Sequence, residues 1–404
     1  MKTVYLHLGT PKTATSSIQV ACERNSNLLR KYGYSFPVFP YKYPGVRIER
    51  NGHFLIEASL MSNRIPDSDI SWQDRLKLGL DMVHKELENY DNVILTDESF
   101  WRSFNYNRQS PLSLLLRDAN EYGYNIKCVV YLRRQDSFLI SRWNQFVKEG
   151  KMTTSLPEHL EWMLEHEPLV MNYAAALDRL SSQIGRENII VRRFEPSSWI
   201  GGTIYTDFVN AVGLPADIPL QPPAKDVNLG LKGNMVELQL LINRLPSLSL
   251  EDKVYFSRYS KKISEKLPAK DQYNQFSAEE TLQFLDQFRK GNEHVVTEYI
   301  RDGQPLFSYE VKDLPKWSQN NLWFLKDTAD FLFELPAPKR SSLIDALPME
   351  TQVLFLTAMV FHLESRVADL EKLNAGKEIN ERANQDIIKK ISRKIGSLSH
   401  TKGR

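Results

Sequence analysis

The chain has little cysteine: its 404 residues include only Cys22 and Cys128. Two cysteines cannot form a disulfide framework, and no Cys-x-x-Cys pair or Cys/His cluster indicates a zinc site. Each cysteine lies beside an apolar run, so we expect two buried thiols. Such sparing use of cysteine is typical of a protein from a reducing compartment.

The sequence also has no apolar run long enough to cross a bilayer. Its first ten residues, MKTVYLHLGT, contain too short an apolar stretch for a signal peptide. Both observations predict a soluble, cytoplasmic protein. The formal net charge is only +2, which excludes a strongly basic nucleic-acid-binding chain but leaves room for a local basic site. We therefore expect no nucleic-acid partner.

Apolar residues make up 42% of the chain, enough for a large core. In the first half, short apolar segments alternate with amphipathic ones. The pattern predicts strands at residues 3–8, 92–96, 127–132 and 189–192. It predicts helices at residues 16–32, 71–90, 111–122 and 136–148. This alternation indicates an α/β fold, a P-loop-like doubly wound parallel sheet flanked by helices, with right-handed crossovers.

The strand pattern stops at about residue 245, and the rest of the chain has helical patterns. We expect residues 1–312 to form a catalytic domain, helical from about residue 246, and residues 313–404 to form a helical C-terminal extension. Spacings of four and three residues predict a short coiled coil there, at Leu356, Val360, Leu363, Val367 and Leu370. The basic stretch at residues 386–404 is expected to be a solvated helix, with peripheral membrane contact as the alternative.

One turn concentrates groups that hold an anion. It lies between the first strand and the first helix and has the sequence Gly9-Thr10-Pro11-Lys12-Thr13-Ala14-Thr15-Ser16-Ser17. The start of a helix offers unpaired N–H groups and the positive end of the helix dipole. Lys12 adds a positive charge, and the hydroxyl groups add hydrogen-bond donors. An ordinary N-capped helix is the alternative, but a cap needs fewer hydroxyl groups. The turn is not a Walker A loop, in which the lysine comes late.

A second motif follows the third predicted strand and has the sequence YLRRQDSFLIS, residues 131–141. Arg133 at the end of the strand and Ser141, eight residues later, can converge on one phosphate, because the serine lies two turns into the next helix. Arginine would supply paired charged donors and serine a neutral one. Arg134 is the neighbouring alternative, and surface ion pairs are the other interpretation of these arginines.

Together the two motifs resemble the family of sulfotransferases that use 3′-phosphoadenosine-5′-phosphosulfate (PAPS), in particular its bacterial, carbohydrate-type members. The stretch HLGTPKTATSSIQ is similar to the family's 5′-phosphosulfate loop, with Ala14 where many members have glycine. Arg133 and Ser141 have the same spacing as the arginine and serine that bind the 3′-phosphate in this family. The resemblance covers about residues 1–312. It implies that residues 9–17, with Arg133 and Ser141, bind PAPS and release the product 3′,5′-bisphosphate (PAP).

The resemblance also implies a reaction in which Lys12 stabilises the leaving oxygen and a general base accepts the proton of the acceptor hydroxyl, with no metal required. Two bases stay open. Glu98 follows the predicted strand NVILT together with Asp97, and His53 lies in ERNGHFLIE. Strand ends face the site in such sheets, so Glu98 and Asp97 should line it. The resemblance places His53 there as well, because some members of the family carry the base in this region. His7, inside the first strand, is expected to be structural.

The acceptor is expected to carry a free hydroxyl, and the resemblance favours a carbohydrate or glycolipid. Residues 36–53 are aromatic, proline-rich and basic, so they either wall an acceptor pocket or form a surface loop. Lys42, Arg47 and Arg50 would suit an anionic acceptor. Two other functions stay open. One is a P-loop kinase-like phosphotransferase, which the early lysine disfavours; the other is a non-catalytic nucleotide-binding scaffold that forms a homo-oligomer through the C-terminal helices.

Overall fold

A computed structural model describes residues 2–40, 48–62, 70–103, 110–223, 230–267, 273–318 and 321–372. The chain divides into two compact units. The first unit comprises Met1–Gly230 and Tyr273–Lys316, and the second comprises Leu231–Gln272 and Trp317–Arg404. The domain boundary at residue 312 stays a prediction. The helices of residues 231–272 belong to the second unit, whereas the sequence pattern had placed them with the sheet.

The first unit contains a five-stranded sheet in which every pairing is parallel. The strands are β1 Thr3–His7, β2 Tyr34–Ser35, β3 Asn92–Thr96, β4 Asn125–Leu132 and β5 Ile189–Arg193. Their order is β2-β3-β1-β4-β5. The predicted α/β class and parallel sheet are confirmed, and the four predicted strands correspond to β1, β3, β4 and β5. The two residues of β2 are too few to produce a periodic pattern.

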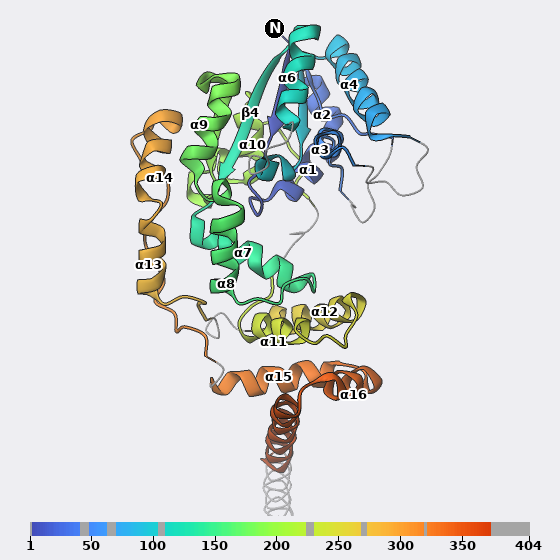
Figure 1. Cartoon of the computed structure of the whole chain (residues 1–404), viewed down its shortest axis with the longest axis vertical. Coiled ribbons are helices and arrows are strands. Elements are labelled where there is room, and N and C mark those ends of the chain that lie inside the picture. Colours follow the sequence, from blue (N-terminus) through green and yellow to red (C-terminus); the bar gives the residue numbers. More distant parts are fainter. Residues whose placement is uncertain are drawn as a thin grey trace, which may run out of the picture. The chain divides into compact units, whose positions relative to one another are not determined.

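Helices of the first unit flank this sheet (Figure 1). Those of the first 211 residues are α1 Thr15–Arg24, α2 Ser26–Lys31, α3 His53–Leu60, α4 Trp72–Asn89, α5 Ser99–Arg102, α6 Pro111–Tyr122, α7 Gln135–Lys148, α8 Leu156–His166, α9 Tyr173–Ile184 and α10 Ile204–Ala211. Two more, α13 Ala278–Asp286 and α14 Arg289–Val295, follow later in the chain. The helix expected at residues 16–32 is divided at Asn25, whose side-chain amide donates to the carbonyls of Ala21 and Gln221.

The strand order brings three chain segments to one edge of the sheet. β1 lies between β3 and β4, and His7 at its end is paired with Thr96 of β3 and Val129 of β4. Because the carboxyl ends of parallel strands meet at the same edge, the segments that follow these three strands emerge side by side. Those segments begin with Leu8, Asp97 and Arg133, and they contain most of the predicted site.

The core beneath this edge is apolar and includes both cysteines, which are buried free thiols as expected. Ile18 of α1 and Phe208 of α10 pack over Tyr5 and Tyr131 on one face of the sheet. His7 is buried there, and its Nδ1 lies 2.9 Å from the hydroxyl of Thr96. Burial lowers the pKa of His7 to about 3, so the ring is neutral and structural.

No helix in the described part of the chain is both long enough and apolar enough to span a lipid bilayer.

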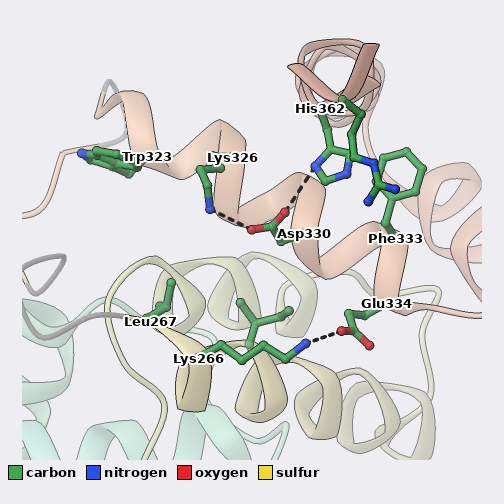
Figure 2. A pocket seen from close by; sticks show the side chains of 10 residues that line it. Lys266, Leu267, Trp323, Lys326, Asp330, Phe333, Glu334 and His362 are labelled. Carbon is green, nitrogen blue, oxygen red and sulfur yellow. Dashed lines mark hydrogen bonds and ion pairs between the residues drawn. The ribbon is translucent and has the colours of Figure 1, made fainter. Parts of the chain in front are cut away.

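The second unit is helical. It contains α11 Asn234–Asn243, α12 Leu250–Lys266, α15 Leu322–Glu334, α16 Ala337–Ala346 and a helix over residues 349–372. A cavity of about 550 Å³ is lined by residues of α12, α15 and the last helix (Figure 2). Most of its charged side chains pair with one another: Lys266 with Glu334 at 2.5 Å, and Asp330 with Lys326 and His362. Arg366 lines the same cavity.

Candidate functional site

The turn after β1 has a backbone conformation that few residues adopt. Gly9, Lys12 and Ala14 have φ angles of 45°, 71° and 58°. For residues with a Cβ this left-handed region costs roughly 1–2 kcal/mol, and such strain concentrates at ligand-binding sites. Ala14 is the N-cap of α1, yet no side chain caps the helix and no acidic residue lies in its first turn. The start of α1 therefore keeps its N–H groups and its positive potential for an anion.

The hydroxyl groups of this loop have two different roles. Thr10 donates to the carbonyl of Tyr131 at 2.6 Å, and Thr13 donates to the carbonyl of Thr10 at 2.6 Å, so both tie the loop together. The hydroxyl of Thr15 is buried and has no hydrogen-bond partner among the described residues. Leaving a buried hydroxyl without a partner costs about 1–3 kcal/mol. Ser16 and Ser17 are half-buried in the first turn of the helix, and Pro11 is half-buried in the loop before it.

Lys12 reaches across to α7, where its Nζ donates to Oε1 of Gln145 at 2.9 Å. Burial lowers the pKa of Lys12, and the positive charges of Lys148 and Arg133 act in the same direction. Glu98 and Glu149 act against this shift. These five charged groups therefore form one electrostatic cluster at the sheet edge. The sequence patterns did not predict that Gln145, Lys148 or Glu149 would belong to it.

Arg133 joins the second motif to the first. It follows β4 directly, and its NH1 donates to the carbonyl of Lys12 at 2.9 Å. Its guanidinium lies 5.6 Å from the ring centroid of Phe194, while its own carbonyl accepts from the hydroxyl of Tyr173 at 2.6 Å. Burial lowers the pKa of Arg133, as expected for a cation that is withdrawn from water.

Arg134, the neighbouring alternative, is engaged elsewhere. It makes two bonds of 2.8 Å to the carboxylate of Asp136 and donates to the carbonyls of Ser308 and Glu310. The structure therefore places Arg133 at the loop and gives Arg134 a structural role. Ser141 is half-buried in α7, one helical turn before Gln145, so it lies on the face of α7 that meets Lys12.

Asp97 holds both His53 and Arg50. Nδ1 of His53 lies 2.7 Å from Oδ2 of Asp97, and Arg50 binds both carboxylate oxygens at 2.5 and 3.1 Å. The backbone N–H of Ser99 also donates to this buried carboxylate. Burial by itself would raise the pKa of Asp97, but Arg50 and His53 hold it well below its usual range. Asp97 therefore stays ionised and fixes the ring of His53 at the start of α3.

Glu98 is the residue after Asp97 and belongs to the cluster around Lys12. Burial raises the pKa of its carboxyl group, and the nearby charges of Asp97 and Glu149 add to this rise. Arg50 and Lys12 oppose it. The structure thus brings both predicted bases to the same edge of the sheet. Glu98 interacts with Lys12, and His53 is bound to Asp97.

The segment that carries His53 is attached to the end of β3. Asn51 accepts from the N–H of Thr96 at 2.8 Å and donates to the carbonyls of Ile94 and Pro37. The N–H of Gly52 donates to the carbonyl of Thr96. A Cβ on Gly52 would lie 2.7 Å from the ring of Phe100, so this close approach requires glycine. Residues 50–52 thereby continue along β3 where β2 has ended.

Of the three cations suited to an anionic acceptor, Arg50 lies in the described part of the chain. Lys42 and Arg47 lie outside the described residues. Arg50 binds Asp97 and the hydroxyl of Ser99, so it has a structural role at the site. Within the described ranges, no group of three or more His, Cys, Asp or Glu side chains is arranged to hold a metal ion.

The site fits an anionic group by three independent features: the uncapped start of α1, the unpartnered hydroxyl of Thr15 and the cations Lys12 and Arg133. No acidic residue lies in the first helical turn to compete with a phosphate. A phosphate oxygen would accept from the hydroxyl of Thr15 and from the free N–H groups together.

Comparison with known proteins gives limited similarity. No family model matches the chain. An uncharacterized protein of Archaeoglobus fulgidus is 26% identical over 178 residues, which are 43% of this chain and 46% of that protein, so the match spans less than half of the relative. The crystal structure of a sulfotransferase from Alicyclobacillus acidocaldarius aligns with 62% of this chain and 95% of the sulfotransferase chain, with 18% sequence identity and a TM-score of 0.35. These values are too low to assign a function.

Replacing Gly9 with alanine is expected to lower the free energy of unfolding by about 1–2 kcal/mol, the cost of a left-handed alanine. The new Cβ would also lie 2.5 Å from the hydroxyl oxygen of Thr15, which adds to the loss. Gly123 is the matched control, because its φ of 87° is also left-handed but nothing lies within 4 Å of its Cβ position. Urea titration of both variants measures the difference. Equal losses at the two positions would contradict the described contact between Gly9 and Thr15.

Proposed function

We propose that this chain is a sulfotransferase that moves a sulfuryl group from PAPS to an acceptor hydroxyl of a carbohydrate or glycolipid. The observation that carries the proposal is the 2.9 Å hydrogen bond from Arg133 to the carbonyl of Lys12. It places the two predicted phosphate-binding motifs, which lie 121 residues apart in the sequence, in direct contact. One small nucleotide with a phosphate at each end would suit such a pair of sites.

In this proposal the 5′-phosphosulfate lies at the start of α1. The N–H groups of Thr15, Ser16 and Ser17 and the hydroxyl of Thr15 would hold the phosphate. Arg133 and Ser141 would hold the 3′-phosphate, with the guanidinium kept in place by the ring of Phe194 and by its bond to the loop. The hydroxyls of Thr10 and Thr13 would keep the loop in shape rather than touch the ligand.

The reaction would form a bond between the acceptor oxygen and sulfur and break the bond between sulfur and the 5′-phosphate oxygen. The electron pair of the broken bond would go to that phosphate oxygen, where Lys12 stabilises the new charge. The acceptor proton would go to Glu98, whose raised pKa makes it a better base than an exposed carboxylate. His53 would be a positioning residue, held by Asp97 at the wall of the site.

The kinase alternative needs carboxylates that hold magnesium. Asp97, the strand-end carboxylate available for this, has its oxygens bound by Arg50, His53 and the N–H of Ser99. This arrangement favours sulfuryl transfer over phosphoryl transfer.

Transfer is tested by incubating the full chain with PAPS that carries ³⁵S and a panel of mono- and oligosaccharides, glycolipids and simple alcohols. We expect labelled sulfate on a sugar hydroxyl and release of PAP in equal amount. Labelled phosphate transfer from ATP, with none from PAPS, would instead support the kinase alternative. Binding of PAP without transfer to any member of the panel would favour the non-catalytic scaffold.

Replacing Arg133 with alanine is expected to weaken PAP binding by on the order of 10- to 100-fold, because hydrogen bonds to charged groups are worth about 1.5–3 kcal/mol. The loss should be specific to the 3′-phosphate. The wild-type chain should therefore bind PAP more tightly than adenosine 5′-phosphate, and the variant should bind both with similar affinity. Titration calorimetry measures the four affinities.

Arg134→Ala is the matched control for this experiment, since Arg134 is bound to Asp136 and to backbone carbonyls. We expect it to retain the wild-type preference for PAP. If Arg134→Ala abolished that preference while Arg133→Ala kept it, the assignment of the 3′-phosphate site would be wrong.

A further inference from the structure

The helix over residues 349–372 presents an exposed apolar stripe. It begins at Met349 and ends at Leu370, and its members are 48% to 77% exposed. They recur at spacings of four and three residues through three heptads, so Met349 and Val353 extend the pattern expected from the sequence. One heptad position holds Val353, Val360 and Val367, and the other holds Met349, Leu356, Leu363 and Leu370.

A different face of this helix anchors it to the second unit. Phe355 and Ala358 are fully buried in the core of that unit. His362 stacks on Phe333 with ring centroids 4.6 Å apart and pairs with Asp330 at 3.3 Å (Figure 2). With 3.6 residues per turn, these anchors point away from the stripe. From residue 363 to residue 372 every side chain is exposed, so the helix extends beyond its anchor.

From this geometry we propose that the stripe binds a second copy of the same chain as a parallel two-stranded coiled coil. In parallel coiled coils, valine at the a position with leucine at the d position favours two strands over three or four. The stripe is complementary to itself, as the interface of a two-fold symmetric dimer requires. Short isolated coiled coils suffer from costly helix nucleation, but here the anchor has already formed the helix.

The charges beside the stripe specify the direction of pairing. Arg366 occupies a g position and Glu371 the e position of the next heptad, so in a parallel pair each would face its opposite on the other copy. Both side chains are exposed, and neither has a hydrogen bond or ion pair with another described residue. In an antiparallel pair e positions face e positions, which would bring Glu364 and Glu371 of the two copies together.

This inference does not depend on the proposed function, because it uses only residues of the second unit. Sedimentation velocity of the full chain at tens of micromolar should give a particle of twice the 46.8 kDa chain mass. Val360→Asp places a charge in the stripe and should yield the single chain. Phe361→Asp is the matched control: Phe361 is 48% exposed on the same helix but outside the stripe, so this variant should stay dimeric. Melting temperatures of both variants show whether the fold is intact.

Direction is tested with Val367→Cys, because equivalent a positions lie side by side only in a parallel, in-register pair. Mild oxidation should cross-link this variant to a covalent dimer, and the chain's own cysteines are buried and should not react. Asp369→Cys, on the outer side of the helix, should not cross-link. The proposal is overturned if the wild-type chain sediments as a single chain. Binding of that single chain to phosphatidylserine vesicles would not restore the proposal. It is also overturned if Val360→Asp stays dimeric, or if Val367→Cys fails to cross-link.

Discussion

Glu98→Gln is expected to lower kcat by on the order of 10²–10⁴-fold, the usual contribution of a general base. The substitution keeps the size of the side chain and removes its ability to accept a proton. Glu98 and Glu149 are the carboxylates in the charge cluster of Lys12. In the proposed reaction it is Glu98 that accepts the proton of the acceptor hydroxyl. Initial rates at saturating PAPS measure the loss.

The same assignment predicts a two-sided dependence of kcat/KM on pH. Activity requires Glu98 to be ionised, and its pKa is raised, so the acidic limb should lie above the ordinary glutamate value of 4.5. Activity requires Lys12 to be protonated, and its pKa is lowered, so the basic limb should lie below the ordinary lysine value of 10.5. In Glu98→Gln the acidic limb should disappear while the basic limb stays.

His53→Gln separates the two candidate bases. Because we assign His53 to positioning, we expect its loss to be smaller than that of Glu98→Gln and the acidic limb to persist. If His53→Gln instead removed the acidic limb and Glu98→Gln retained most of the activity, the base would be the histidine oriented by Asp97.

Lys12→Met is expected to lower kcat by on the order of 10²–10³-fold, the effect of removing one group that stabilises a developing negative charge. The KM for PAPS should change less, because charge accumulates on the leaving oxygen mainly in the transition state. Methionine retains most of the aliphatic length of lysine but cannot donate to Gln145 or to the leaving oxygen. Steady-state kinetics with varied PAPS separate the two parameters.

Lys127→Met is the control for Lys12→Met, since Lys127 is a half-buried lysine near the start of β4, away from the sheet edge that carries the loop. It should leave kcat unchanged. A Lys12→Met variant with wild-type kcat would show that Lys12 only shapes the loop and would remove it from the chemistry.

The sequence carried the information for most of the sheet because buried parallel strands are short, continuous apolar runs. Cys128 to Leu132 are all fully buried, and the corresponding sequence is apolar throughout. Strand β2 gave no such signal, since only Tyr34 and Ser35 pair with β3. The division between the units was also hidden, because the second unit is built from two separated stretches of chain.

The site was less predictable, because hydroxyl direction and long-range pairing are set by tertiary contacts. The sequence does not distinguish the hydroxyl groups of Thr10, Thr13 and Thr15. In the structure Thr10 and Thr13 donate to backbone carbonyls, and the hydroxyl of Thr15 has no partner among the described residues. Its charge made Arg50 suitable for an anionic acceptor, and the structure shows that it binds Asp97. That pairing follows from the attachment of Asn51 to β3, which no local pattern reveals. Gln145 could have been predicted to lie near the site, because it follows Ser141 by four residues on the same helix and therefore shares its face.

The central claim is that the Lys12 loop and Arg133 with Ser141 bind opposite ends of one adenosine bisphosphate. The most direct test is titration calorimetry of the wild-type chain with PAP in the presence of EDTA, and with ATP in the presence of magnesium. The account predicts one PAP bound per chain without added metal, and much weaker binding of ATP. Absence of PAP binding together with magnesium-dependent binding of ATP would contradict it.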